Sequence, residues 1–89
     1  MANYVLVRSK IRDFQEWKAE YDNHLPSREA AQLTEKHLLR GTEDQNEVII
    51  LFGAADMAKA KAFTESADLR EAMQKSGVVD KPDIYFLNG

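Results

Sequence analysis

The stretch that decides the fold is residues 35–53, EKHLLRGTEDQNEVIILFG. Its two ends, residues 35–41 and 47–53, carry the large apolar side chains that are typical of strands, and five polar residues separate them. A polar connection of this length is typical of a hairpin loop, so the sequence predicts two antiparallel neighbouring strands. The first is interrupted by charged side chains at Lys36 and Arg40, as expected of a strand at the edge of a sheet.

Upstream of this hairpin, residues 3–10 (NYVLVRSK) predict another strand, followed by an amphipathic helix. Asp13 is placed to cap that helix, with Glu16 three positions on, and aromatic side chains then recur at spacings of three and four. Pro26 lacks an N–H and crowds the preceding turn. We therefore expect the helix to break there and a second helical piece to cover residues 27–33.

Downstream of the hairpin, Asp56 is placed to cap an alanine-rich helix, and Ser66 or Asp68 to cap another. Gly77 follows as a left-handed C-cap. Residues 83–87 (DIYFL) predict the last strand.

The element order is therefore β-α-β-β-α-β. We expect residues 1–89 to form one α+β domain of the ferredoxin-like type, with a four-stranded antiparallel sheet and the helices on one face. The strands at residues 4–7, 48–52 and 84–87, however, are apolar at both odd and even positions. Leaving the second face in water costs on the order of 25 cal/mol for every Å² of apolar surface. We therefore expect a homodimer that packs sheet against sheet.

Charge and residue types exclude several classes of function. With 12 Lys and Arg against 15 Asp and Glu, the formal net charge is -3, so we expect neither nucleic acid nor a membrane surface as a partner. The chain has no cysteine, and His24 and His37 lie too far apart for a metal-ligand pattern. The longest apolar run, residues 48–52, is too short to span a bilayer. We expect a cytoplasmic protein without a metal or an organic cofactor.

Three segments carry a resemblance to a known superfamily: DFQEWKAEYDNH (residues 13–24), NEVIILF (46–52) and AFTESADLREAMQKSGV (62–78). With the element order, they resemble the dimeric α/β-barrel superfamily, in particular its small stand-alone antibiotic-biosynthesis-monooxygenase-like and uncharacterised members. The resemblance covers essentially the whole chain and implies a homodimeric α/β barrel. The superfamily includes cofactor-free oxygenases, isomerases, haem-degrading enzymes and domains without known activity, so its fold does not fix a function.

The resemblance disfavours haem. The haem-degrading members take a Trp and a His from the second half of the chain, whereas Trp17, His24 and His37 all lie in the first half.

The side chains of Phe14, Trp17, Tyr21, His24 and Arg28 share one stripe on a helical wheel. One interpretation is a substrate pocket between helix and sheet, in which Trp17 and Tyr21 form an aromatic wall. His24 would then be the catalytic base, and Arg28 would bind an anionic oxygen of the substrate. The alternative is an ordinary amphipathic helix, with its aromatic residues in the core and its polar end extending into solvent.

Arg40 is a further candidate for substrate binding. It shares the parity of Leu38, opposite to His37, so it points toward the helices if Leu38 does. The alternative is a solvated charge on an edge strand. Arg8 on the first predicted strand is a candidate of the same kind.

Together with the resemblance, these residues imply a cofactor-free oxygenase-like or isomerase-like enzyme acting on a small aromatic or polyketide-like compound. The alternative is a non-catalytic homodimer that binds a small molecule or a protein.

Overall fold

A computed structural model describes residues 2–89. The elements, in chain order, are β1 (Asn3–Lys10), α1 (Phe14–Asn23), α2 (Leu25–Ala30), β2 (Leu33–Arg40), β3 (Glu47–Ala54), α3 (Met57–Thr64), α4 (Ala67–Ser76) and β4 (Asp83–Asn88). The predicted order is confirmed, and each helical segment between strands consists of two helices. Within residues 2–89, no helix is both long enough and apolar enough to cross a membrane.

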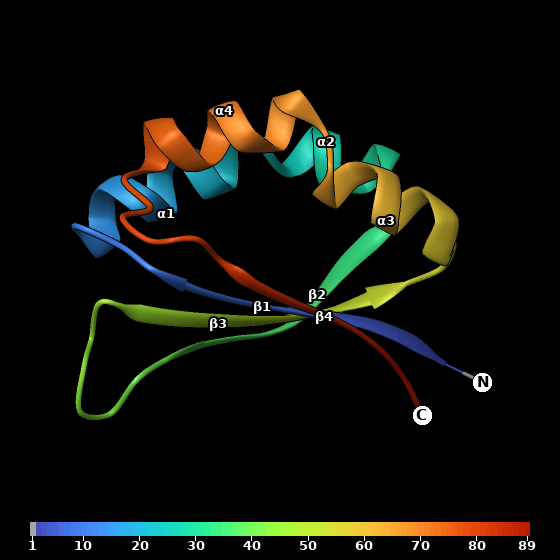
Figure 1. Cartoon of the computed structure of the whole chain (residues 1–89), viewed down its shortest axis with the longest axis horizontal. Helices are drawn as coiled ribbons and strands as arrows, with labels where there is room; N and C mark the ends of the chain where they lie inside the picture. Colours follow the sequence, from blue (N-terminus) through green and yellow to red (C-terminus); the bar gives the residue numbers. More distant parts are fainter. Residues whose placement is uncertain (1) are drawn as a thin grey trace.

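The strands form one antiparallel sheet in the order β2-β3-β1-β4, which is the ferredoxin-like arrangement. Figure 1 shows the helices together on one side of this sheet and the other side uncovered. β2 lies at an edge, as the charged residues in its sequence predict.

Helix α1 begins where the sequence predicts. The Asp13 carboxylate accepts a hydrogen bond from the backbone N–H of Glu16 at 2.9 Å. The Glu16 carboxylate does not complete a capping box, because it binds Arg12 instead. Pro26 lies in the first turn of α2, where a helix does not need its missing N–H.

The prediction that the second helical piece extends to residue 33 is wrong. Helix α2 ends at Ala30, and Gln32 adopts a left-handed backbone conformation with φ of 60°, which a right-handed helix cannot continue. Leu33 begins β2 and its side chain is buried in the core. The strand predicted at residues 35–41 thus starts earlier than expected, and it contains a β-bulge after Glu35.

The core lies between the sheet and the helices. On β1 and β3 every second side chain is buried there, and Trp17 and Ala60 cover these strands from the helical layer. The buried residues of β1 and β3 are Val5, Val7, Ser9, Val48, Ile50, Phe52 and Ala54.

The opposite side of the sheet, here called the open face, is also apolar. The strand register places on it Tyr4, Leu6, Leu39, Ile49, Leu51, Tyr85 and Leu87. Tyr85 is 52% exposed, and none of the elements within residues 2–89 covers this face. The predicted apolar character of both faces of the sheet is confirmed.

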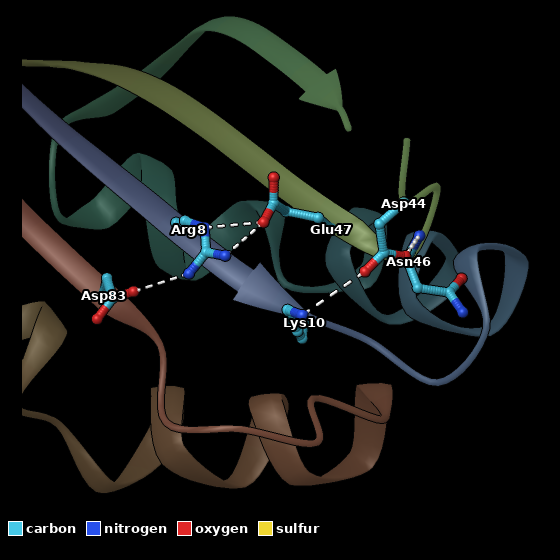
Figure 2. A network of polar contacts seen from close by, with 6 residues as sticks. All are labelled: Arg8, Lys10, Asp44, Asn46, Glu47 and Asp83. Atoms are coloured by element: carbon cyan, nitrogen blue, oxygen red, sulfur yellow. Dashed lines mark hydrogen bonds and ion pairs between the residues drawn. The ribbon is translucent and has the colours of Figure 1, made fainter. Parts of the chain in front are cut away.

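A polar network lies at one end of the open face (Figure 2). The Arg8 guanidinium donates to the Glu47 carboxylate on β3 and, at 3.0 Å, to the Asp83 carboxylate on β4. These hydrogen bonds raise the pKa of Arg8. Lys10 lies 3.6 Å from Asp44 in the β2–β3 loop. Ion pairs as exposed as these contribute little to stability, but they tie β1 to both neighbouring strands.

Gly77 ends α4 in the left-handed conformation, with φ of 86°. Replacing it by alanine is expected to lower the free energy of unfolding by about 1–2 kcal/mol, because a Cβ is unfavourable at this φ. The Cβ would also lie 2.7 Å from Oε1 of Glu16, but that flexible side chain can move. Urea denaturation measures the loss. Gly77→Asn is the control, since asparagine tolerates this backbone better; an equal loss in both variants would contradict the backbone explanation.

Candidate functional site

A cavity lies between the sheet and the helical layer. Its empty space, counted together with the solvent at its opening, is about 620 Å³. Strands β1 and β3 form its floor, and all four helices contribute to its walls. The apolar side chains that line it include Val5, Ile50, Phe52, Phe63, Leu69 and Met73.

Four of the five predicted site residues line this cavity: Trp17, Tyr21, His24 and Arg28. The helical stripe therefore faces a cavity rather than a fully packed core. Trp17 is nonetheless buried and belongs to the core cluster, so it serves both as a packing residue and as part of the cavity wall.

Tyr21 contacts both neighbours on the stripe. Its ring stacks on Trp17 with centroids 4.7 Å apart, and the Arg28 guanidinium carbon lies 3.7 Å from the Tyr21 ring centre. The Tyr21 hydroxyl donates to the Glu35 carboxylate at 2.7 Å. Burial, and then this hydrogen bond, raise the pKa of Tyr21, so the phenol stays neutral. The ring of Tyr21 thus lines the cavity, while its hydroxyl is hydrogen-bonded to Glu35 on β2.

Arg28 is a buried cation without an acidic partner. The residue is 6% exposed, and its Nη1 donates to the backbone carbonyl of Tyr21 at 2.6 Å. None of the ion pairs formed within residues 2–89 includes Arg28. Burial lowers the pKa of Arg28, but a guanidinium remains protonated near neutral pH. A buried charge is costly unless it is paired, and an anionic oxygen placed beside the guanidinium would reduce that cost.

His24 joins α1 to α2, and its ring is largely enclosed, with a side chain that is 13% exposed. The ring lies 5.6 Å from that of Phe63, and Nε2 lies 2.9 Å from the Asp68 carboxylate on α4. This hydrogen bond lowers the pKa of Asp68. The site therefore pairs a histidine with a carboxylate at the edge of an apolar cavity.

The structure does not bring Arg40 or Arg8 to the cavity. Leu38 packs against the core, so Arg40 does lie on the helix side, but its guanidinium covers the ring of Phe14 at 4.0 Å. Arg40 Nε also donates to the Gln45 carbonyl at 2.9 Å. Arg8 shares the open face with Leu6, on the opposite side of the sheet from the cavity.

Sequence reasoning missed the contribution of the second half of the chain. Asp68 was considered as a helix cap, but Ser66 fills that role by accepting from the backbone N–H of Leu69 at 3.1 Å, which leaves the Asp68 side chain available to His24. Ser9 and Ser76 add hydroxyl groups to the cavity lining. The capping pattern at residues 66–69 was the sequence signal that could have drawn attention to Asp68.

No family model and no curated protein matches this chain. Solved structures of low sequence identity do share its fold. One is a protein from Bordetella bronchiseptica provisionally assigned as an antibiotic biosynthesis monooxygenase, with a TM-score of 0.78 and 14% identity over 99% of this chain and 96% of that one. A second, with the same provisional assignment, is from Caulobacter crescentus, with a TM-score of 0.74 and 16% identity over 99% and 89% of the two chains.

A third similar structure is a mutant of SnoaB, a cofactor-independent oxygenase from Streptomyces nogalater, with a TM-score of 0.73 and 8% identity over 99% of this chain and 92% of that one. The chain thus has the fold of antibiotic-biosynthesis-monooxygenase-like proteins, which confirms the resemblance and the fold class inferred from the sequence. Identities this low establish the fold and not the activity.

Proposed function

We propose that this protein is a small-molecule enzyme of the monooxygenase-like kind, which binds an aromatic compound in the cavity with an anionic oxygen at Arg28. The observation that carries the proposal is the buried guanidinium of Arg28, which forms no ion pair within residues 2–89, in a mostly apolar cavity beside His24. The fold shared with SnoaB supports the same class of activity.

The chemistry needs only a base and a cation. His24 accepts a proton from an acidic C–H group of the bound compound, the C–H bond breaks, and its electron pair remains on the compound as an enolate whose oxygen binds Arg28. In an oxygenase the enolate then reacts with O₂. Overall a CH₂ group becomes a carbonyl, one oxygen atom stays in the product, and the other leaves as water with the two hydrogen atoms. In an isomerase the proton returns at another carbon and no O₂ is consumed.

The protein works, in this proposal, as a homodimer that buries the open face of each copy against the other. Exposed apolar patches of this kind mark association surfaces in folded proteins, and a short chain gains stability by association.

Two measurements test the function. Native mass spectrometry of the purified protein reports both the subunit count and any retained compound. An oxygen electrode then measures O₂ uptake with 9(10H)-anthracenone, a fused-ring ketone with an acidic CH₂ group. Uptake above background that is lost in His24→Gln supports the oxygenase. A retained compound that is bound and never changed would instead favour the non-catalytic alternative.

Replacing Arg28 by methionine is expected to weaken binding of an aromatic anion by about 10- to 100-fold, because the anion loses a buried charge-assisted partner. Isothermal titration with 2-naphthoate and its neutral amide measures the effect. The wild type should prefer the anion and Arg28→Met should not. Arg70→Met, on the exposed side of α4, is the matched control, and Arg40→Met tests the binding role predicted from the sequence. Equal affinity for anion and amide in the wild type would contradict the role of Arg28.

A further inference from the structure

His24 lies between two different environments. On one side it lines the apolar cavity, and on the other it lines a small polar hollow formed by Glu20, Asn23, His24, Asp68, Glu71, Ala72 and Lys75. The Asp68 side chain is 63% exposed, so the carboxylate that holds Nε2 is itself in contact with solvent. A proton accepted by the ring from the cavity side thus has a hydrated carboxylate beside it for its release.

The backbone around His24 is fixed from both directions. Its N–H donates to the carbonyls of Glu20 and Tyr21, and its carbonyl accepts from the N–H groups of Ser27 and Arg28. The position of the ring is therefore decided by its side-chain torsions, which the contacts with Phe63 and Asp68 restrain. Of these two contacts, the one with Phe63 is apolar and the one with Asp68 is a hydrogen bond.

The protonation state of Asp68 decides which ring nitrogen carries hydrogen. The Asp68 side chain is 63% exposed and stands in the first turn of α4, where the helix dipole favours a negative charge, so the carboxylate is ionised near neutral pH. An ionised carboxylate can only accept hydrogen bonds. At 2.9 Å, Nε2 must therefore be the donor, and in the neutral ring the lone pair is left on Nδ1.

We propose that Asp68 is a positioning residue of the site, which holds His24 in the Nε2–H form and so makes Nδ1 the proton-accepting atom. This inference rests on the proposed function of His24 as the base. It extends that function, because it assigns proton release to the Nε2 side of the ring, which faces Asp68 and solvent. Glu71 and Lys75 in the polar hollow are the other charged groups on α4 that face this route, and Glu20 faces it from α1.

The ¹⁵N shifts of the His24 ring test the assignment without any ligand, in protein labelled at histidine and at a pH where the ring is neutral. The wild type is expected to show the Nε2–H form alone. Asp68→Asn is expected to populate both forms, because an amide can donate to the ring as well as accept from it. Glu71→Gln, in the same hollow but without a hydrogen bond to His24, is the matched control and should resemble the wild type.

An Nδ1–H form in the wild type, or ring shifts that do not change in Asp68→Asn, would overturn the proposal. O₂ uptake with 9(10H)-anthracenone separates it from the proposed function. If the enzyme is active, Asp68→Asn should lower kcat about 10-fold or more with little change in KM, and Glu71→Gln should not. If the ring form changes as expected but the wild type consumes no O₂, the positioning of His24 stands and the oxygenase function falls.

Discussion

Leu6→Lys is expected to convert the proposed homodimer into monomers. Leu6 lies on β1 at the centre of the open face, opposite Leu51 on β3 and Tyr85 on β4. A lysine there would place an ammonium group inside the proposed interface, without a carboxylate from the apolar neighbours to pair with it. In a symmetric dimer the substitution occurs twice, so the dissociation constant should rise by about 100-fold or more.

Light scattering after size-exclusion chromatography, over a series of protein concentrations, measures the change. Val79→Lys is the control, because Val79 is an exposed apolar residue that lies outside the sheet. The thermal midpoint of the wild type should rise with protein concentration, and that of Leu6→Lys should not. A wild type that is monomeric at all concentrations, or a Leu6→Lys variant that remains a dimer, would contradict the proposed association.

Trp17→Ala is expected to lower the free energy of unfolding by about 3–5 kcal/mol, which is the usual cost of removing a large aromatic side chain from a core. Trp17 is buried against the sheet, and it also packs on Tyr21 and Phe14. Its removal therefore loosens the aromatic support of the Arg28 guanidinium as well. Urea denaturation followed by circular dichroism measures the loss.

Trp17→Phe is the matched variant, since it keeps an apolar ring and should cost much less than alanine. A loss below about 1 kcal/mol in Trp17→Ala would mean that Trp17 only lines the cavity and does not support the core.

Local patterns were enough to predict the strands, to within two residues at their ends, and the stripe that runs from α1 into α2. The alternation of apolar residues, the cap at Asp13 and the spacing from Trp17 to Arg28 are properties of neighbouring residues, so one sequence contains them. The sequence did not decide whether the polar end of the stripe would be buried, because that depends on how α3 and α4 pack over it. The sequence also predicted correctly that Arg40 lies on the same face of the sheet as Leu38. It did not predict that the Arg40 guanidinium would pack on the ring of Phe14.

The pairing of His24 with Asp68 depends on tertiary packing. The two residues are 44 positions apart, and they meet because α4 lies beside α1. The early end of α2 has a similar origin: the backbone turns at Gln32 because Leu33 is drawn into the core beside β3. In both cases a contact between residues distant in the sequence determined the local structure, which the local propensities alone did not determine.

Trp17 is the one tryptophan of the chain, and it lies in the wall of the cavity. The indole fluorescence of this protein therefore comes from a single site. Its emission reports the polarity of that cavity, and a compound that enters should shift or quench it while binding elsewhere leaves it unchanged. Collections of unlabelled compounds can therefore be screened in solution for binding to this cavity by following the fluorescence of Trp17.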